Sequence, residues 1–153
     1  MPDATPPRRN SPCAVIDTNV LLDFWVFGDA RAAPLRAAVE SGRVRVLRSG
    51  AAVDEFSEVL SRPRFDISNE RRCSILRLWD RLAEPVARLH AAPWHCSDPA
   101  DQIFLDLAWS ARVDWLVTRD ASLLRAGRRT QRDGLLILEP VAAVRQLANR
   151  TSN

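Results

Sequence analysis

The chain is 153 residues long, 46% hydrophobic and 27% charged, a composition typical of a single soluble domain with a buried core. No window approaches the roughly 18 consecutive apolar residues of a membrane span. Residues 1–12 lack the apolar centre of a secretory signal. The composition therefore excludes a membrane-spanning protein and predicts a cytoplasmic one.

The basic residues are all of one kind. All 22 are arginine, and the formal net charge is +3. Arginine is the better side chain for bidentate contact with phosphate, although a lysine-free sequence could equally reflect genome composition. The three cysteines are widely spaced, and His95 beside Cys96 cannot complete a tetrahedral zinc site. Reduced thiols are therefore expected.

Apolar patterning predicts alternating strands and helices between a flexible tail, residues 1–12, and a disordered end, residues 150–153. A single domain is expected over residues 13–149. In its first half we expect strands at 13–16, 44–47 and 86–89, and helices at 19–27, 30–40, 50–60 and 69–83. In its second half we expect strands at 115–117 and 135–138, with a helix starting at Pro99, a short helix at 122–124 and a last helix at 140–147.

Short, continuously apolar strands that alternate with helices are typical of a parallel sheet covered on both faces. The sequence therefore predicts an α/β domain, a three-layer α/β/α sandwich around a central parallel sheet. Its crossover connections should be right-handed.

Acidic residues recur where this fold places its sites, outside the carboxyl ends of the strands. Asp17 directly follows the first strand, and Asp120 comes shortly after the strand at 115–117. Glu55 lies one turn into the helix after the second strand. Asp101 lies in the first turn of the helix that Asp98 and Pro99 begin. We therefore expect these acids to share one edge of the sheet.

Such a cluster of carboxylates repels itself and needs a cation to stay ionised. Oxygen ligands select Mg²⁺ or Mn²⁺ over zinc, and either ion can activate water and neutralise an attacked phosphate. Taken singly, each acid has an ordinary explanation: Asp17 and Asp120 as helix caps, Asp101 as a partner of the helix dipole, Glu55 as a solvated residue. Taken together, four such coincidences at one edge favour a metal-dependent site acting on phosphodiesters.

Four segments resemble the motifs of the PilT N-terminus (PIN) domain family in order and spacing. Residues 14–22 are similar to its first motif, an apolar strand followed by Asp17-Thr18-Asn19. Residues 54–65 are similar to the second motif, which supplies a glutamate, and residues 97–108 to the third. Residues 115–120, followed by Leu123 and Leu124, resemble the fourth. The subgroup that the chain resembles most is that of the toxin components of toxin–antitoxin systems.

This resemblance implies a PIN-like fold with about five parallel strands and a Mg²⁺- or Mn²⁺-dependent ribonuclease that cleaves RNA. It implies a set of metal ligands that are also catalytic: Asp17, Glu55, Asp101 and Asp120. Asn19 and Thr118 would orient carboxylates or water. Asp98 would cap its helix or add a metal contact. The resemblance further implies a homodimer, with some of the five tryptophans at the interface, and a cognate antitoxin as a possible partner.

The sequence departs from the family pattern at two positions. Ala100 stands where this subgroup has another acid, which leaves Asp101 in place, and Arg119 stands where a small residue is common. Arg119 could narrow the site or contact phosphate. Further arginines could form a basic rim that contacts RNA phosphates, or belong to a solvated loop: Arg62, Arg64, Arg125, Arg128, Arg129 and Arg132.

Other enzyme classes fit poorly. A haloacid-dehalogenase-like phosphatase needs a second aspartate where Asn19 stands, and both it and a response-regulator receiver need a lysine. No phosphate-binding glycine loop and no nucleophile elbow occurs in the sequence. The remaining alternative is a non-catalytic PIN-like module that binds RNA or protein without cutting. Metal-dependent cleavage discriminates between the two.

Overall fold

The computed structural model describes residues 11–152, so most of the expected flexible tail, residues 1–12, lies outside the described residues. Pro12, which we assigned to that tail, is buried. Its carbonyl accepts the backbone N–H of Arg45 at 2.9 Å. The fold therefore includes Pro12.

Five parallel strands form one sheet in the order β3-β2-β1-β4-β5. They are β1 (Cys13–Ile16), β2 (Arg45–Arg48), β3 (Ala83–Pro85), β4 (Trp115–Val117) and β5 (Leu136–Leu138). The first strand is central, because Val15 lies opposite Leu47 of β2 on one side and Leu116 of β4 on the other. The predicted α/β fold with a five-stranded parallel sheet is confirmed.

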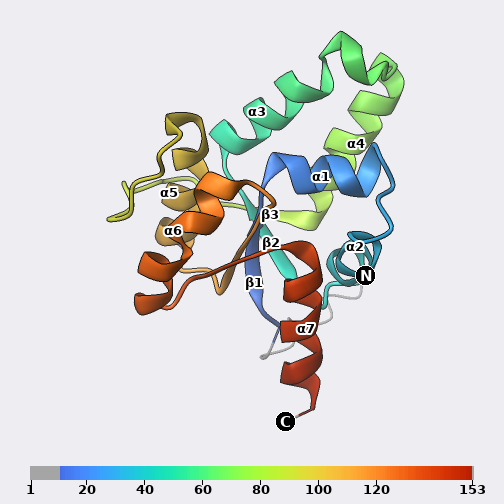
Figure 1. Ribbon diagram of the computed structural model, residues 1–153. Helices are drawn as coiled ribbons and strands as arrows, with labels where there is room; N and C mark the ends of the chain where they lie inside the picture. Colours follow the sequence, from blue (N-terminus) through green and yellow to red (C-terminus); the bar gives the residue numbers. More distant parts are fainter. Residues whose placement is uncertain (1–10, 153) are drawn as a thin grey trace.

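Helices flank this sheet on both sides (Figure 1). They are α1 (Thr18–Trp25), α2 (Ala33–Glu40), α3 (Gly50–Leu60), α4 (Asn69–Leu82), α5 (Gln102–Ala111), α6 (Ala121–Arg132) and α7 (Pro140–Thr151). Two short 3₁₀ turns, η1 (Pro63–Phe65) and η2 (Pro99–Asp101), precede α4 and α5. Over residues 11–152, none of the helices has the length and apolar content needed to span a bilayer.

Alternation along the strands separates the core into two layers, because successive strand side chains point to opposite faces. Ala14 and Ile16 of β1 pack on the face covered by α1, α2, α3, α4 and α7. Val15 lies on the other face, with Phe104 of α5 and Leu123 of α6. Trp79 and Trp115 are core residues, with 3% and 1% of their surface exposed.

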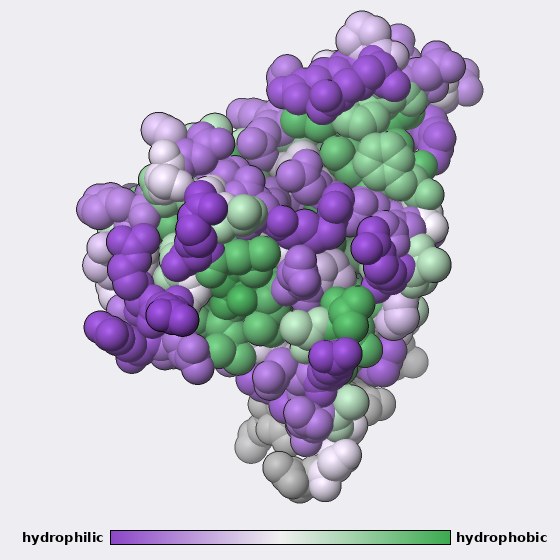
Figure 2. Space-filling view, viewed as in Figure 1, coloured by the Kyte–Doolittle hydropathy of each residue, from purple (hydrophilic) through white to green (hydrophobic). Residues whose placement is uncertain are grey.

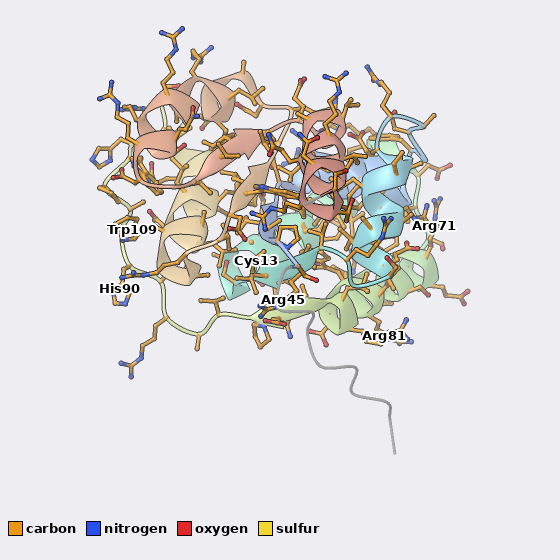
Figure 3. All side chains as sticks on the ribbon, turned by 90° about the horizontal axis from the view of Figure 1, so that it is seen from below. Cys13, Arg45, Arg71, Arg81, His90 and Trp109 are labelled. Carbon is orange, nitrogen blue, oxygen red and sulfur yellow. The ribbon has the colours of Figure 1, made fainter. Side chains whose placement is uncertain are left out.

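All five strands run in one direction, so their carboxyl ends lie together at one end of the sheet, the upper end in Figure 1. Figure 3 is seen from the opposite end, where Cys13 and Arg45 begin β1 and β2. Helices α3 and α4 extend beyond the carboxyl end and are joined there through η1 (Figure 1).

The third strand is not where the sequence predicted it. The expected strand at 86–89 is wrong, and β3 instead follows α4 directly, with Ala83 opposite Val46. Buried Ala83 packs in the core, and Glu84 forms an ion pair with Arg45 of β2, N···O 2.7 Å. Pro85 is tolerated because β3 is an edge strand, where a missing N–H leaves no neighbour unpaired.

The last two helices are longer than predicted. The short helix expected at 122–124 continues to Arg132, because Ala126 and Thr130 extend the buried stripe that Leu123 begins. Thr130 is polar and gave no apolar signal, but its hydroxyl donates to the carbonyl of Leu135 at 3.0 Å. The final helix runs to Thr151 and so includes Arg150, which we had expected to be disordered.

Candidate active site

The four predicted acids come from four elements that meet at the carboxyl end of the sheet. Asp17 follows β1 and precedes α1, and its own N–H donates to the carbonyl of Val117 at the end of β4, 3.0 Å away. Asp120 caps α6 after the same strand. Glu55 lies in α3, and Asp101 ends η2 just before α5.

Asp17 is the buried centre of this group, with only 3% of its surface exposed. The Thr118 hydroxyl donates to its Oδ2 at 2.7 Å. The pKa of Asp17 is raised to about 6, chiefly by burial and also by the nearby charges of Glu55 and Asp120, although the Thr118 hydrogen bond lowers it. The carboxylates of Glu55 and Asp120 are therefore close enough to repel that of Asp17.

Two threonines hold the carboxylates on this side of the site. The Thr118 hydroxyl, fully buried, also accepts the backbone N–H of Asp120 at 2.9 Å and so links Asp17 to Asp120. The Thr18 hydroxyl donates to Oε2 of Glu55 at 2.6 Å. Thr18 was inside the first motif, yet its role was missed, because only the fold brings α1 beside α3.

Asp101 and Asp120 form a second, tighter pair, joined by a serine that the sequence did not single out. The Ser122 hydroxyl lies 2.7 Å from Oδ1 of Asp120 and 3.2 Å from Oδ2 of Asp101. It also lies 3.2 Å from the Cys96 sulfur. A serine hydroxyl carries a single proton, so it cannot donate to both carboxylates at once.

The pKa values of Asp101 and Asp120 are shifted in opposite directions. The pKa of Asp101 is raised to about 7, chiefly by burial and also by the charges of Asp120 and Asp17. Burial would raise the pKa of Asp120 too. Hydrogen bonds from the side chain and backbone of Ser122 and from the Leu123 N–H instead hold that pKa below its ordinary value.

The remaining predicted polar residues are placed less centrally. Asp98 is exposed and caps η2, accepting the Ala100 N–H at 3.0 Å, which matches its expected role as a helix cap. Asn19 is exposed in the first turn of α1, and its backbone hydrogen bond to Asp17 helps to lower the pKa of that acid.

A family model matches most of the chain. The model of the PIN domain matches residues 13–122, which span β1 to the first turn of α6 and contain all four acids. The chain belongs to the PIN domain family. PIN domains are generally nucleases, and they typically use divalent metals. No curated protein matches the sequence.

The oxygen atoms that this PIN domain offers at the site are chemically suited to a divalent cation. All four predicted ligands offer carboxylate oxygens, the ligands that Mg²⁺ and Mn²⁺ prefer. As they stand, however, no three histidine, cysteine, aspartate or glutamate side chains within residues 11–152 converge enough to hold a metal ion. The hydroxyls of Thr18, Thr118 and Ser122 instead stabilise the carboxylates. Hydrogen bonds from three hydroxyls thus stabilise part of the negative charge that a cation would neutralise.

The arginines expected to contact RNA fall into two groups in this PIN domain. Three already have partners: Arg119 forms an ion pair with buried Asp23, N···O 2.7 Å, Arg62 pairs with Glu58 at 3.0 Å, and Arg64 lies over the Phe65 ring. Asp23 was missed because it is an acid on the buried side of α1. Arg125 and Arg128, in contrast, are exposed on α6.

Proposed function

We propose that this PIN domain is an endoribonuclease that hydrolyses RNA phosphodiester bonds with the help of Mg²⁺ or Mn²⁺. The observation that carries the proposal is the mutual repulsion of acids drawn from four separate elements. It contributes to raising the pKa of Asp17 to about 6 and that of Asp101 to about 7. A protein gains nothing in stability from such an arrangement, whereas a cation-dependent site requires it.

The residues that would hold the cation are Asp17, Glu55, Asp101 and Asp120. A bound Mg²⁺ or Mn²⁺ would lower the pKa of its water and offset charge on the attacked phosphate. Thr118 orients Asp17 through the hydrogen bond to Oδ2, and Thr18 does the same for Glu55. Ser122 keeps Asp101 and Asp120 side by side despite their repulsion.

The alternative is a non-catalytic PIN-like module that binds RNA or protein. One observation favours it: the carboxylates do not converge on a ready-made ligand set in residues 11–152. We prefer the nuclease, because a binding module has no need for a buried aspartate whose neighbours are also acids.

Metal-dependent cleavage tests the proposal. Purified protein is incubated with end-labelled single-stranded RNA in Mg²⁺, in Mn²⁺ and in EDTA. Cleavage is expected with either metal only, and Asp17→Asn should reduce it by about a hundredfold or more, since charge at the reacting centre is usually the largest catalytic contribution. Asp54→Asn is the matched control, because Asp54 is an exposed acid of α3. Equal cleavage by Asp17→Asn, or cleavage in EDTA, would reject the nuclease mechanism.

We further propose that the protein is the toxin of a toxin–antitoxin pair, that it forms a homodimer and that a cognate antitoxin binds it. The support is the motif resemblance together with the acidic site. Expression in a bacterial host should then arrest growth, and Asp17→Asn should relieve the arrest. Growth that is unaffected by the active protein would contradict the toxin role without touching the nuclease proposal.

A further inference from the structure

Helix α6 carries a stripe of four arginines on its exposed face: Arg125, Arg128, Arg129 and Arg132. At about 100° per residue, the four fall within an arc of roughly 100°. The buried residues of the helix, Leu123, Ala126 and Thr130, lie on the opposite side. This basic stripe is therefore a separate surface with no part in packing α6 against the sheet.

Within residues 11–152, no ion pair balances the charge of the basic stripe. None of its four arginines forms an ion pair with an acid of the described chain, whereas seven arginines elsewhere do. Arg129 donates to the His95 carbonyl at 2.9 Å, a neutral partner. Helix α6 contains no acidic residue, and strongly hydrophilic residues gather over it in Figure 2. Like charges three and four residues apart on a helix destabilise it, so this surface suits an anionic partner.

The basic stripe begins beside the acidic site. Asp120, which caps α6, is one of the four proposed ligands, so the helix leads directly away from the acids. With a rise of about 1.5 Å per residue, Arg125 to Arg132 covers about 10 Å of the helix axis. This length allows the four arginines to contact successive phosphates of one strand.

We propose that the basic stripe binds the phosphate backbone of a single-stranded RNA on one side of the bond to be cut. The inference rests on the proposed function, because it names the path of that substrate. Guanidinium groups bind phosphate oxygens in a bidentate manner and carry no base preference there. The paired arginines Arg62 and Arg119, in contrast, would first have to give up Glu58 and Asp23. The stripe therefore supplies affinity without reading the sequence.

Binding without cleavage tests this proposal separately from catalysis. The affinity of Asp17→Asn protein for a fluorescent single-stranded RNA is measured by anisotropy over a range of salt concentrations. The stripe variant carries Arg125→Gln, Arg128→Gln, Arg129→Gln and Arg132→Gln. The matched control carries Arg77→Gln, Arg81→Gln, Arg88→Gln and Arg145→Gln, which are exposed arginines on other surfaces. Arg81, for example, lies on α4, on the opposite side of the molecule from α6 (Figure 3).

We expect the stripe variant to bind RNA roughly tenfold or more weakly, and its salt slope to fall by up to about three, since each phosphate contact to a single strand contributes about 0.7. The control, with the same net charge, should bind like the parent. Equal losses in both variants would mean a general charge effect and would overturn the proposal. Polyglutamate serves as a probe for an acidic protein partner. A stripe variant that binds RNA normally but loses affinity for polyglutamate would also overturn the proposal.

Single variants Arg125→Gln and Arg132→Gln keep the test valid if the fourfold variant does not fold, and each should lower the salt slope by about 0.7. The two proposals can fail independently. A protein that never cleaves RNA but loses binding in the stripe variant would refute the nuclease and leave the stripe in place. Metal-dependent cleavage with unchanged binding by the stripe variant would refute the stripe alone.

Discussion

Acidic side chains lie at both ends of the parallel sheet, but their electrostatic surroundings are opposite. At the amino end, shown in Figure 3, Glu84 pairs with Arg45 at 2.7 Å, and Asp114 accepts the Cys13 N–H at 2.9 Å and pairs with Arg150 at 3.4 Å. At the carboxyl end, Asp17 faces other carboxylates, and its hydrogen bonds come from neutral groups, the Thr118 hydroxyl and the Asn19 backbone.

This comparison distinguishes acids that stabilise the fold from acids that destabilise it. A carboxylate beside a guanidinium or a backbone N–H contributes modestly to stability. A buried carboxylate beside other carboxylates costs stability, and its pKa rises as a result. The acids at the amino end therefore stabilise the sheet, whereas those at the carboxyl end place unfavourable charge there.

The largest stability effect should come from removing the buried charge. The pKa of Asp17 is raised to about 6 from an ordinary value near 4. A raised pKa means that its contribution to stability is present below about pH 4 and is lost as the pH rises through about 6. Asp17→Asn should therefore stabilise the metal-free protein at pH 7.5 by up to about 3 kcal/mol. Urea unfolding in EDTA at pH 4.5 and 7.5 measures this.

In that experiment, the gain from Asp17→Asn should shrink at pH 4.5, where Asp17 is largely protonated. When the unfolding is repeated at pH 7.5 in Mg²⁺ without EDTA, the metal should stabilise the parent more than the variant. Asp54→Asn again serves as the control, because its carboxylate is exposed. A variant that is less stable than the parent at pH 7.5 would show that this end of the sheet is not electrostatically strained.

A smaller effect, on metal affinity and cleavage, should come from changing Ser122, which lies between Asp101 and Asp120. Ser122→Ala removes the hydroxyl that lies within 3.2 Å of both Asp101 and Asp120. We expect about a 10- to 100-fold loss of metal affinity or activity, the usual effect of removing a group that orients metal ligands. RNA cleavage measured as a function of Mg²⁺ concentration reports this loss. The Mg²⁺ concentration that gives half-maximal activity should be higher for the variant than for the parent.

Ser122→Thr keeps the hydroxyl and should restore most of the activity. Ser74→Ala, at an exposed position of α4, is the matched control and should behave like the parent. If Ser122→Ala cuts RNA normally at low Mg²⁺, the serine only supports Asp120 as the cap of α6.

The smallest effect should come from the amino end. Asp114→Asn weakens the ion pair with Arg150 while its amide oxygen can still accept the Cys13 N–H. We expect a loss of about 0.5–1 kcal/mol in the free energy of unfolding and unchanged cleavage. Thermal unfolding and the RNA assay check the two parts. A marked loss of cleavage would show that the two ends of the sheet are not independent.

Several features of the protein were determined by the sequence alone. Short apolar runs followed by acids specify buried parallel strands with carboxylates at their ends, because the strand period and the rule for the carboxyl edge are local and general. Asp17, Glu55, Asp101 and Asp120 could therefore be named from their positions alone. The family motifs added Thr118, whose hydroxyl bonds Asp17 as expected.

Other features were decided only by the tertiary structure, because they depend on contacts between distant segments. Thr18 and Glu55 are 37 residues apart, and Ser122 and Asp101 are 21 apart, so their hydrogen bonds leave no local pattern. The same holds for β3, whose place beside β2 is fixed by pairing across the sheet. Helix α6 reached Arg132 because packing buried Thr130, and that same packing turned four arginines into one exposed stripe.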